Sequence, residues 1–131
     1  MVRYKDGTTT TLNLSGVISG TYDKTNNQID PYTGIPNIRE AVQIDIGSNV
    51  TGIGDACFAY CYELVTLNLP PTITSIGSND DTIAHWVFYG STNLRNLYIS
   101  NGLTTLPKWA FYHENSIISI NFPKTVLLNK D

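Results

Sequence analysis

Two cysteines are the residues of this chain whose types and spacing most readily support chemistry. Cys57 and Cys61 lie four positions apart in the stretch DACFAYCYELVTLNLP, residues 55–70. Such a pair could bind a metal ion or undergo thiol–disulfide exchange, but a structural zinc site needs four ligands and no second cluster follows. Free cysteine also packs as a small apolar residue. We favour packing, with metal binding and redox chemistry as alternatives.

The two histidines give weaker signals. Neither His85 nor His113 has a serine, cysteine or carboxylate in a pattern that supports nucleophilic catalysis, so we expect plain surface residues. The run SNDD at residues 78–81 could offer oxygen ligands to a cation. Calcium loops, however, need several alternating oxygen ligands and usually a further carboxylate. We therefore expect a solvated loop there.

Other acidic residues leave a hydrolase as a minor alternative. Asp45, Asp55 and Glu63 could act as acids or bases, yet nothing in the sequence specifies an acid–base pair. No phosphate-binding glycine loop, G-x-S-x-G or H-E-x-x-H motif occurs. The sequence thus predicts no catalytic residue, no metal and no cofactor.

The elements that would position these residues come from an internal repeat. Segments that begin at Ala56, Trp86 and Trp109 align without gaps inside each unit. Cys57 falls in a column of small apolar residues, which supports the packing interpretation. The main apolar columns are Phe58, Phe88 and Phe111; Leu64, Leu94 and Ile117; Leu67, Leu97 and Ile120; Leu69, Ile99 and Phe122; and Ile73, Leu103 and Val126.

The repeat has a period of 23 residues. Phe88 and Phe111 are 23 positions apart, whereas Phe58 and Phe88 are 30 positions apart. The seven extra residues fall at about 78–84, in a polar stretch that we interpret as a loop insertion at the edge of a repeat.

The sequence of each repeat predicts a short strand. In LVTLNL the apolar Leu67 and Leu69 alternate with Thr66 and Asn68, which is the period of a half-buried strand. GDACFAYC is too short for an average helix, so we expect one helical or 3₁₀ turn there. One coil of this kind cannot bury its own apolar face, so the coils should stack. The alternation recurs in four rows, at residues 44/46, 67/69, 97/99 and 120/122.

This pattern resembles the BspA-like (treponemal-type) leucine-rich repeat. The resemblance covers residues 38–126 and implies a β-rich leucine-rich-repeat solenoid. The departures are the insertion, Leu106-Pro107 in place of Ile-Gly, and a cysteine column that reads Cys61, Ser91 and Glu114. The residues that carry the resemblance are Ile53-Gly54, Phe58, Cys61, Leu64, Leu67, Leu69, Pro70, Ile73 and Ile76-Gly77.

Residues 1–37 lie outside the repeat. VRYKDGTTTTLNL predicts a β-hairpin, because Asp6-Gly7 suits a tight type I′ turn. The stretch at 15–37 is rich in Gly, Asn, Pro and Thr, so we expect it to be mostly loop. A solenoid exposes apolar rows at its ends. We therefore predict an N-terminal cap over residues 1–37 and a repeat region over 38–131.

Composition excludes some classes of partner. The formal net charge is −3 and no basic stripe occurs, which argues against nucleic acid. No run of about 18 uncharged apolar residues could span a membrane. The first residues lack the apolar core of a signal peptide, so the signal of an exported protein would have to be absent from this chain.

The predicted strands would present a nearly uncharged face. Residues between the buried positions of a strand point to the opposite side. This face could bind a protein or a glycan, or it could be an ordinary soluble sheet surface. The residues are Gln43, Asp45, Thr66, Asn68, Asn96, Tyr98, Ser119 and Asn121.

Two aromatic columns form a second candidate surface. Trp86 aligns with Trp109, and Tyr89 aligns with Tyr112. They could be partly buried core or an exposed anchor patch of the kind enriched at interfaces. We favour the anchor patch.

The predicted function is non-catalytic binding. The resemblance implies a bacterial cell-surface or secreted protein that contacts host proteins, glycans or other cells, which is an inference by analogy of fold. The alternative is a structural or assembly segment of a larger surface or phage-tail protein.

Overall fold

Strands make up nearly all the regular structure of this protein. The structure is a computed structural model that describes residues 1–77, 86–99, 103, 105–106, 119–121 and 127–128. Within these residues the helical element is a single 3₁₀ turn at Ile38–Glu40. The predicted insertion at 78–84, His85 and His113 lie outside the described part of the chain.

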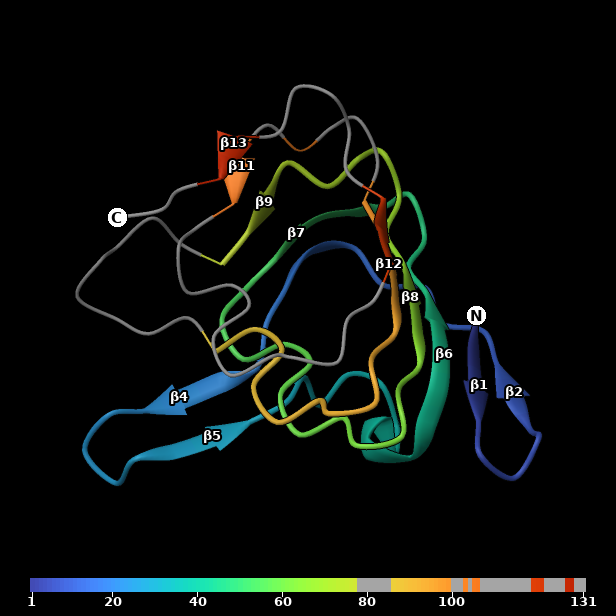
Figure 1. Ribbon diagram of the computed structural model, residues 1–131, viewed down its shortest axis with the longest axis horizontal. Helices are drawn as coiled ribbons and strands as arrows, with labels where there is room; N and C mark the ends of the chain where they lie inside the picture. Colours follow the sequence, from blue (N-terminus) through green and yellow to red (C-terminus); the bar gives the residue numbers. More distant parts are fainter. Residues whose placement is uncertain (78–85, 100–102, 104, 107–118, 122–126, 129–131) are drawn as a thin grey trace.

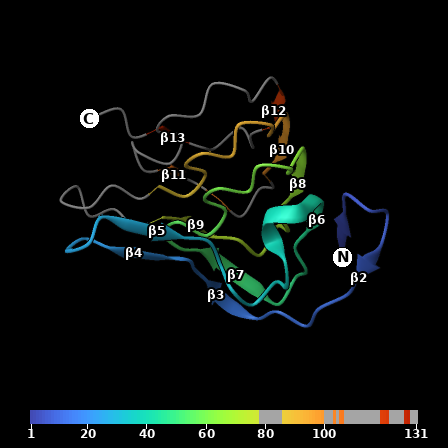
Figure 2. The same cartoon turned by 90° about the horizontal axis from the view of Figure 1, so that it is seen from below.

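The largest sheet is built from the repeated alternating segments. Its order is β12-β10-β8-β6-β1-β2. The first four strands in this order run parallel and stack one above another along one side of the molecule (Figure 2). Their bounds are Ser119–Asn121 for β12, Asn96–Tyr98 for β10, Thr66–Asn68 for β8 and Ala41–Asp45 for β6.

The pairing register is the one that the sequence columns predict. Ile44 pairs with Leu67, Leu67 with Leu97, and Leu97 with Ile120. Ile44, Leu67 and Leu97 are fully buried. A slip of one residue would turn these apolar side chains outward and the polar ones inward, so burial fixes the register.

A second line of strands lies on another side of the coils (Figure 1). β3 (Gly16–Ile18), β7 (Val50–Ile53) and β9 (Ser75–Ile76) form one parallel sheet, and β11 (Thr105–Leu106) pairs in parallel with β13 (Leu127–Leu128). Ile18, Ile53 and Ile76 lie in register and are buried. The core fills the space between the two lines of strands.

The turns that carry the phenylalanine column close the coils between those two lines. Phe58 and Phe88 are fully buried, with ring centroids 6.0 Å apart and planes only 9° from parallel. Residues 55–60 form successive turns rather than the predicted helical or 3₁₀ turn. The reason is that Phe58 N–H and Tyr60 N–H donate to the carbonyls of Val87 and Tyr89 in the next coil, at 2.9 and 2.7 Å. Those amides are therefore unavailable for helical bonds.

The backbone conformation of these turns repeats from one coil to the next. Ala56 and Trp86, two positions before the phenylalanines, have φ of 58° and 45°. Tyr60 and Gly90, two positions after them, have φ of 56° and 78°. Left-handed residues at matched positions give both turns the same path, although most side chains disfavour this region.

The predicted N-terminal hairpin is present, with a different turn. β1 (Val2–Tyr4) pairs antiparallel with β2 (Thr9–Thr10) and, on its other edge, with β6. The type I′ turn is wrong, because Asp6 does not have the positive φ that this turn requires. Tyr4 N–H instead donates to Thr8 O and Gly7 N–H to Tyr4 O, which closes a three-residue loop with Gly7 at φ 90°.

The expectation of mostly loop over 15–37 is also partly wrong. β3 extends the second line of strands, and β4 (Thr21–Asp23) pairs with β5 (Gln28–Asp30) in a hairpin that projects from the coils (Figure 1). In the turn of this hairpin, Asp23 Oδ1 accepts bonds from the N–H groups of Thr25 and Asn26. Aspartate commonly stabilises turns in this way.

Candidate functional site

The strand face consists of the side chains that alternate with the buried ones of β6, β8, β10 and β12. Six of them have described side chains, which are partly exposed and lie in two in-register rows. Ser119 and Asn121 continue the rows by their backbone pairing in β12. The described rows are Gln43, Thr66 and Asn96, and Asp45, Asn68 and Tyr98.

Hydrogen bonds between these side chains hold the first half of the face in place. Asp45 Oδ1 accepts a bond of 2.6 Å from Asn68 Nδ2 and one of 3.2 Å from Gln43 Nε2. Asn96 Nδ2 donates to Thr66 Oγ1 at 3.3 Å. The carboxylate of Asp45 thus orients two amide groups, which restricts the rotamers of both.

The second half of the face offers exposed apolar contact area. Tyr98 is 39% exposed, and Val65, which precedes β8, is 38% exposed. Val65 lies between neighbouring coils, because its N–H donates to Val42 O and its carbonyl accepts from Arg95 N–H. Tyrosine is among the residues enriched at the centres of protein interfaces.

The aromatic cluster is formed by Tyr22, Tyr60, Tyr62, Trp86 and Tyr89. The rings touch in sequence: Tyr22–Trp86 at 6.2 Å, Trp86–Tyr89 at 4.7 Å, Tyr89–Tyr60 at 5.5 Å and Tyr60–Tyr62 at 5.9 Å between centroids. Trp86 and Tyr89 are half-buried, and Tyr62 is 49% exposed. Trp109 and Tyr112 lie outside the described residues.

The β4–β5 hairpin takes part in this cluster, which the sequence did not indicate. Tyr22 comes from β4 and packs against Trp86, and Ile29 of β5 lies in the same apolar group. The two predicted residues Trp86 and Tyr89 are therefore brought together, but with the hairpin as their neighbour. A tyrosine and an isoleucine in alternating strands around an Asp-x-x-Asn turn were the available signal.

The two cysteines are packed in the core, as expected. Cys57 and Cys61 are reduced and fully buried. Burial raises the pKa of the Cys57 thiol well above its usual value, and Cys61 adds to the rise. Burial raises the pKa of the Cys61 thiol to about 12, against smaller lowering effects of Arg39 and Ser91. Neither thiol has the thiolate character that reactivity requires.

Ser91 shows why the cysteine column can change its residue. Its hydroxyl is fully buried and accepts from Cys61 N–H at 3.1 Å while donating to Phe58 O at 2.5 Å. Two main-chain groups of the preceding coil are thereby satisfied by one side chain of the next. Serine can occupy the cysteine column because its hydroxyl makes buried hydrogen bonds where the thiol of Cys61 packs as a small apolar group.

The acidic residues named as hydrolase candidates do not form a common site. Asp45 is bonded to strand-face amides, and Glu63 Oε1 lies 3.9 Å from Lys5 Nζ. Asp55 is partly buried after β7. Among the residues that the structure describes, no three His, Cys, Asp or Glu side chains gather in a way that could hold a metal ion.

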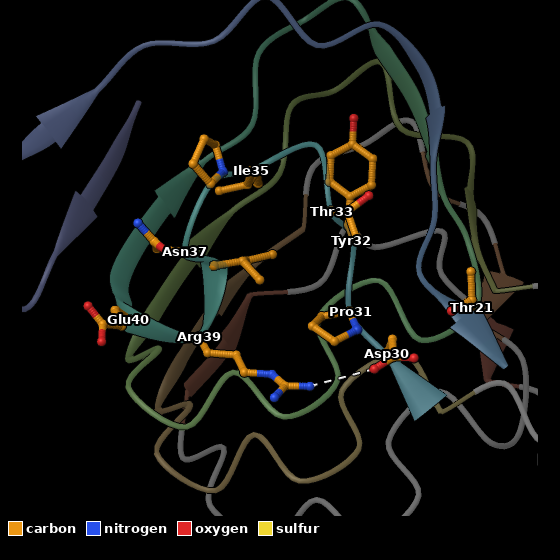
Figure 3. Close-up of a pocket in the computed structure, with 11 residues that line it drawn as sticks. Thr21, Asp30, Pro31, Tyr32, Thr33, Ile35, Asn37, Arg39 and Glu40 are labelled. Carbon is orange, nitrogen blue, oxygen red and sulfur yellow. Dashed lines mark ion pairs between the residues drawn. The ribbon is translucent and has the colours of Figure 1, made fainter. Parts of the chain in front are cut away.

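A pocket that the sequence did not indicate opens at the N-terminal end of the stack. Its volume is about 580 Å³, and residues 30–40 supply most of its lining. Figure 3 shows Arg39 extending across it toward Asp30. None of Asp45, Asp55 and Glu63 contributes to it.

Comparisons with known proteins agree with the repeat pattern. The family model described as BspA type leucine rich repeat region (6 copies) matches residues 78–128. Over these residues the match confirms the resemblance that the sequence columns indicated. Neither the curated proteins nor the solved structures contain a match to the chain. In the described part of the chain, no helix is long and apolar enough to cross a membrane.

Proposed function

From the match of residues 78–128 to BspA-type leucine-rich repeats, we propose that this protein is a non-catalytic module that binds a protein partner through its strand face. Leucine-rich repeats generally mediate protein interactions and are generally not enzymes. The step from the repeat to this particular surface rests on the geometry of the face, because fold alone does not specify a site.

The observation that carries the proposal is the in-register stacking of the two polar rows. Strands about 4.8 Å apart present amide, hydroxyl and carboxylate groups at a fixed spacing. The bonds of Asp45 to Gln43 and Asn68 order these groups before any partner arrives. Preordered side chains lose less conformational entropy on association, which favours binding.

The apolar part of the face supplies the other requirement of an interface. Tyr98 and Val65 remain exposed although most apolar side chains of the repeats are buried. Tyrosine contributes a large apolar area together with a hydroxyl that can bond to the partner. We propose Tyr98 as the residue whose truncation costs the most affinity.

The setting of this module is proposed from the same family. We propose a solenoid of 23-residue coils in which residues 1–37 act as an N-terminal cap, carried by a bacterial cell-surface or secreted protein. Its partners would then be host proteins, glycans or other cells. The support for the location is the family match, and the support for the cap is the pairing of β1 with the outer edge of β6.

The aromatic columns are the second candidate surface. Trp86 and Tyr89 pack edge to face, at a centroid distance of 4.7 Å with their planes 76° apart. Rigid aromatic side chains bind at low entropic cost. Trp109 and Tyr112 stand in the same columns of the sequence repeat.

A binding screen tests the proposal. Purified extracellular-matrix proteins are passed over the immobilised wild-type chain, the variant Tyr98→Ala and the control Val17→Thr. Val17 is 65% exposed on β3, in the other line of strands. We expect at least one matrix protein to bind, with affinity reduced about tenfold in Tyr98→Ala and unchanged in Val17→Thr. Binding that is equal in all three proteins would reject the strand face.

A further inference from the structure

The pocket of Figure 3 has the size and accessibility of a ligand site. Its volume of about 580 Å³ lies within the range of about 300–1,000 Å³ that is usual for such sites. We propose that it binds a neutral sugar residue, for example the terminal residue of a glycan. This inference concerns a different surface from the strand face and does not depend on it.

The interior of the pocket is suited to the apolar side of a sugar ring. Pro31, Ile35 and Ile38 line it and are buried, and the ring of Tyr32 is partly buried beside them. The Tyr32 ring lies over Gly34, where a Cβ added at that glycine would come within 2.3 Å of Tyr32 Cζ. An aromatic ring next to aliphatic carbons can cover the C–H face of a sugar.

The rim of the pocket carries Asp30 and Arg39, whose charged groups lie too far apart for a short hydrogen bond to each other. Arg39 Nη2 lies 3.8 Å from Asp30 Oδ1, which is longer than the 2.7–2.9 Å of a charge-assisted hydrogen bond. Asp30 Oδ2 accepts from Gln28 Nε2 at 2.9 Å. Hydroxyl groups of a ligand can therefore accept from the guanidinium and donate to the carboxylate, and both side chains are about half exposed.

The charges around the pocket favour a neutral ligand. Asp30 and Glu40 face one cation, Arg39, within the lining. Lys5 Nζ lies 3.9 Å from Glu40 Oε1 but is not part of the lining. An anionic group such as a sialic acid or a phosphate would meet two carboxylates and one guanidinium, so it gains no net attraction. A neutral, hydroxyl-rich ring can use both signs at once.

A ligand longer than one residue can reach the aromatic cluster. The guanidinium carbon of Arg39 lies 5.8 Å from the centroid of the Tyr60 ring, within the range of a cation–π contact. Arg39 is thus shared by the pocket and the cluster, and Tyr62, next to Tyr60, is 49% exposed. The second residue of a glycan would pack on these rings.

Sugar titration followed by ¹H–¹⁵N NMR tests the inference. The probes are maltotriose, cellotriose, mannotriose and N,N′,N″-triacetylchitotriose, with 3′-sialyllactose as an anionic probe. We expect saturable shifts in residues 30–40 with at least one neutral probe. Affinity should fall about tenfold or more in Asp30→Ala and in Arg39→Ala, because each loses hydrogen bonds to a charged group.

Two control variants separate this site from the others. Lys24 lies in the turn of the β4–β5 hairpin, which also carries Asp30, and Asp45 lies on the strand face. The control variants are Lys24→Ala and Asp45→Asn. Both should leave sugar binding unchanged. The inference is overturned if no neutral probe shifts residues 30–40 of the wild-type chain, if 3′-sialyllactose binds more tightly than the neutral probes, or if Asp45→Asn abolishes the shifts. The chemical-shift changes in residues 30–40 of the wild-type chain test the inference even if a pocket variant fails to fold.

Discussion

Ser91 is the residue at which one coil depends most directly on the next. Replacing it by alanine removes the acceptor of Cys61 N–H and the donor to Phe58 O, both in the buried interior. Leaving buried main-chain groups without partners costs about 1–3 kcal/mol. We therefore expect Ser91→Ala to lower the free energy of unfolding by about that amount, measured by urea denaturation.

The preceding coil supplies the matched control for this substitution. Ser91→Cys places in the second coil the residue that Cys61 provides in the first. A thiol is a weaker donor and acceptor than a hydroxyl but fills the space. Its loss of stability should be smaller than that of Ser91→Ala. An unchanged free energy of unfolding in Ser91→Ala would mean that the hydroxyl bonds are not what stabilises this position.

The cysteines give a second prediction at the residue scale. The pKa of the Cys61 thiol is raised to about 12 and that of Cys57 is also raised, so both stay protonated at pH 8. Because the thiolate is the reactive form, a disulfide reagent should label neither thiol in the native protein and both after denaturation. Fast labelling under native conditions would contradict the packing interpretation.

At the scale of the elements, the turns between the two lines of strands depend on left-handed residues. Gly90 has φ 78°, and a Cβ at this position would lie 2.7 Å from Tyr60 Cδ1. Gly90→Ala should therefore destabilise the chain by about 1–3 kcal/mol through backbone strain and this contact, as measured by urea denaturation.

Gly47 provides the control for the turn prediction. A Cβ added there meets nothing within 4 Å, and its φ lies outside the left-handed region. Gly47→Ala should leave the free energy of unfolding nearly unchanged. If Gly47→Ala and Gly90→Ala lowered the free energy of unfolding equally, the left-handed backbone at Gly90 would not be the cause of the destabilisation.

The first line of strands could be predicted from the sequence, and parts of the second could not. Alternation of apolar and polar residues with a 23-residue period is enough to align Ile44 with Leu67, because one face must be buried. Ile18 joins the column of Ile53 and Ile76, but it lies 35 positions before Ile53 and follows no phenylalanine. Because this spacing differs from the 23-residue period, alignment of the repeats could not assign Ile18 of β3 to the column.

The turns and the pocket escaped prediction for a related reason. Residues 55–60 are shaped by main-chain bonds to the next coil, such as Phe58 N–H to Val87 O, and local sequence does not reveal such partners. The pocket arises where the segment at 30–40 passes the β4–β5 hairpin. The strand-face residues, in contrast, follow directly from strand periodicity, and their part in binding remains a prediction.

At the scale of the whole molecule, the N-terminal hairpin covers the β6 edge of the four parallel strands. β1 pairs with β6 through Val2 and Ile44 and through Arg3 and Gln43. An uncovered edge offers unpaired N–H and C=O groups to another chain. Deletion of residues 1–10 should therefore increase concentration-dependent association, measured by analytical ultracentrifugation.

The hairpin turn provides a control for the deletion. Asp6→Ala removes only the bonds that Asp6 Oδ1 accepts from Thr8. This variant should sediment like the full chain. A deletion variant that keeps the same association state and stability would argue against the cap.

The central claim is that the strand face, rather than the aromatic columns, binds the partner. Its most direct test is the affinity of Tyr98→Ala beside that of Trp109→Ala for a matrix protein found in the screen, with both variants verified to be as stable as the wild type. The account predicts affinity reduced about tenfold or more in Tyr98→Ala and little changed in Trp109→Ala. Loss of binding in Trp109→Ala with Tyr98→Ala unaffected would contradict it.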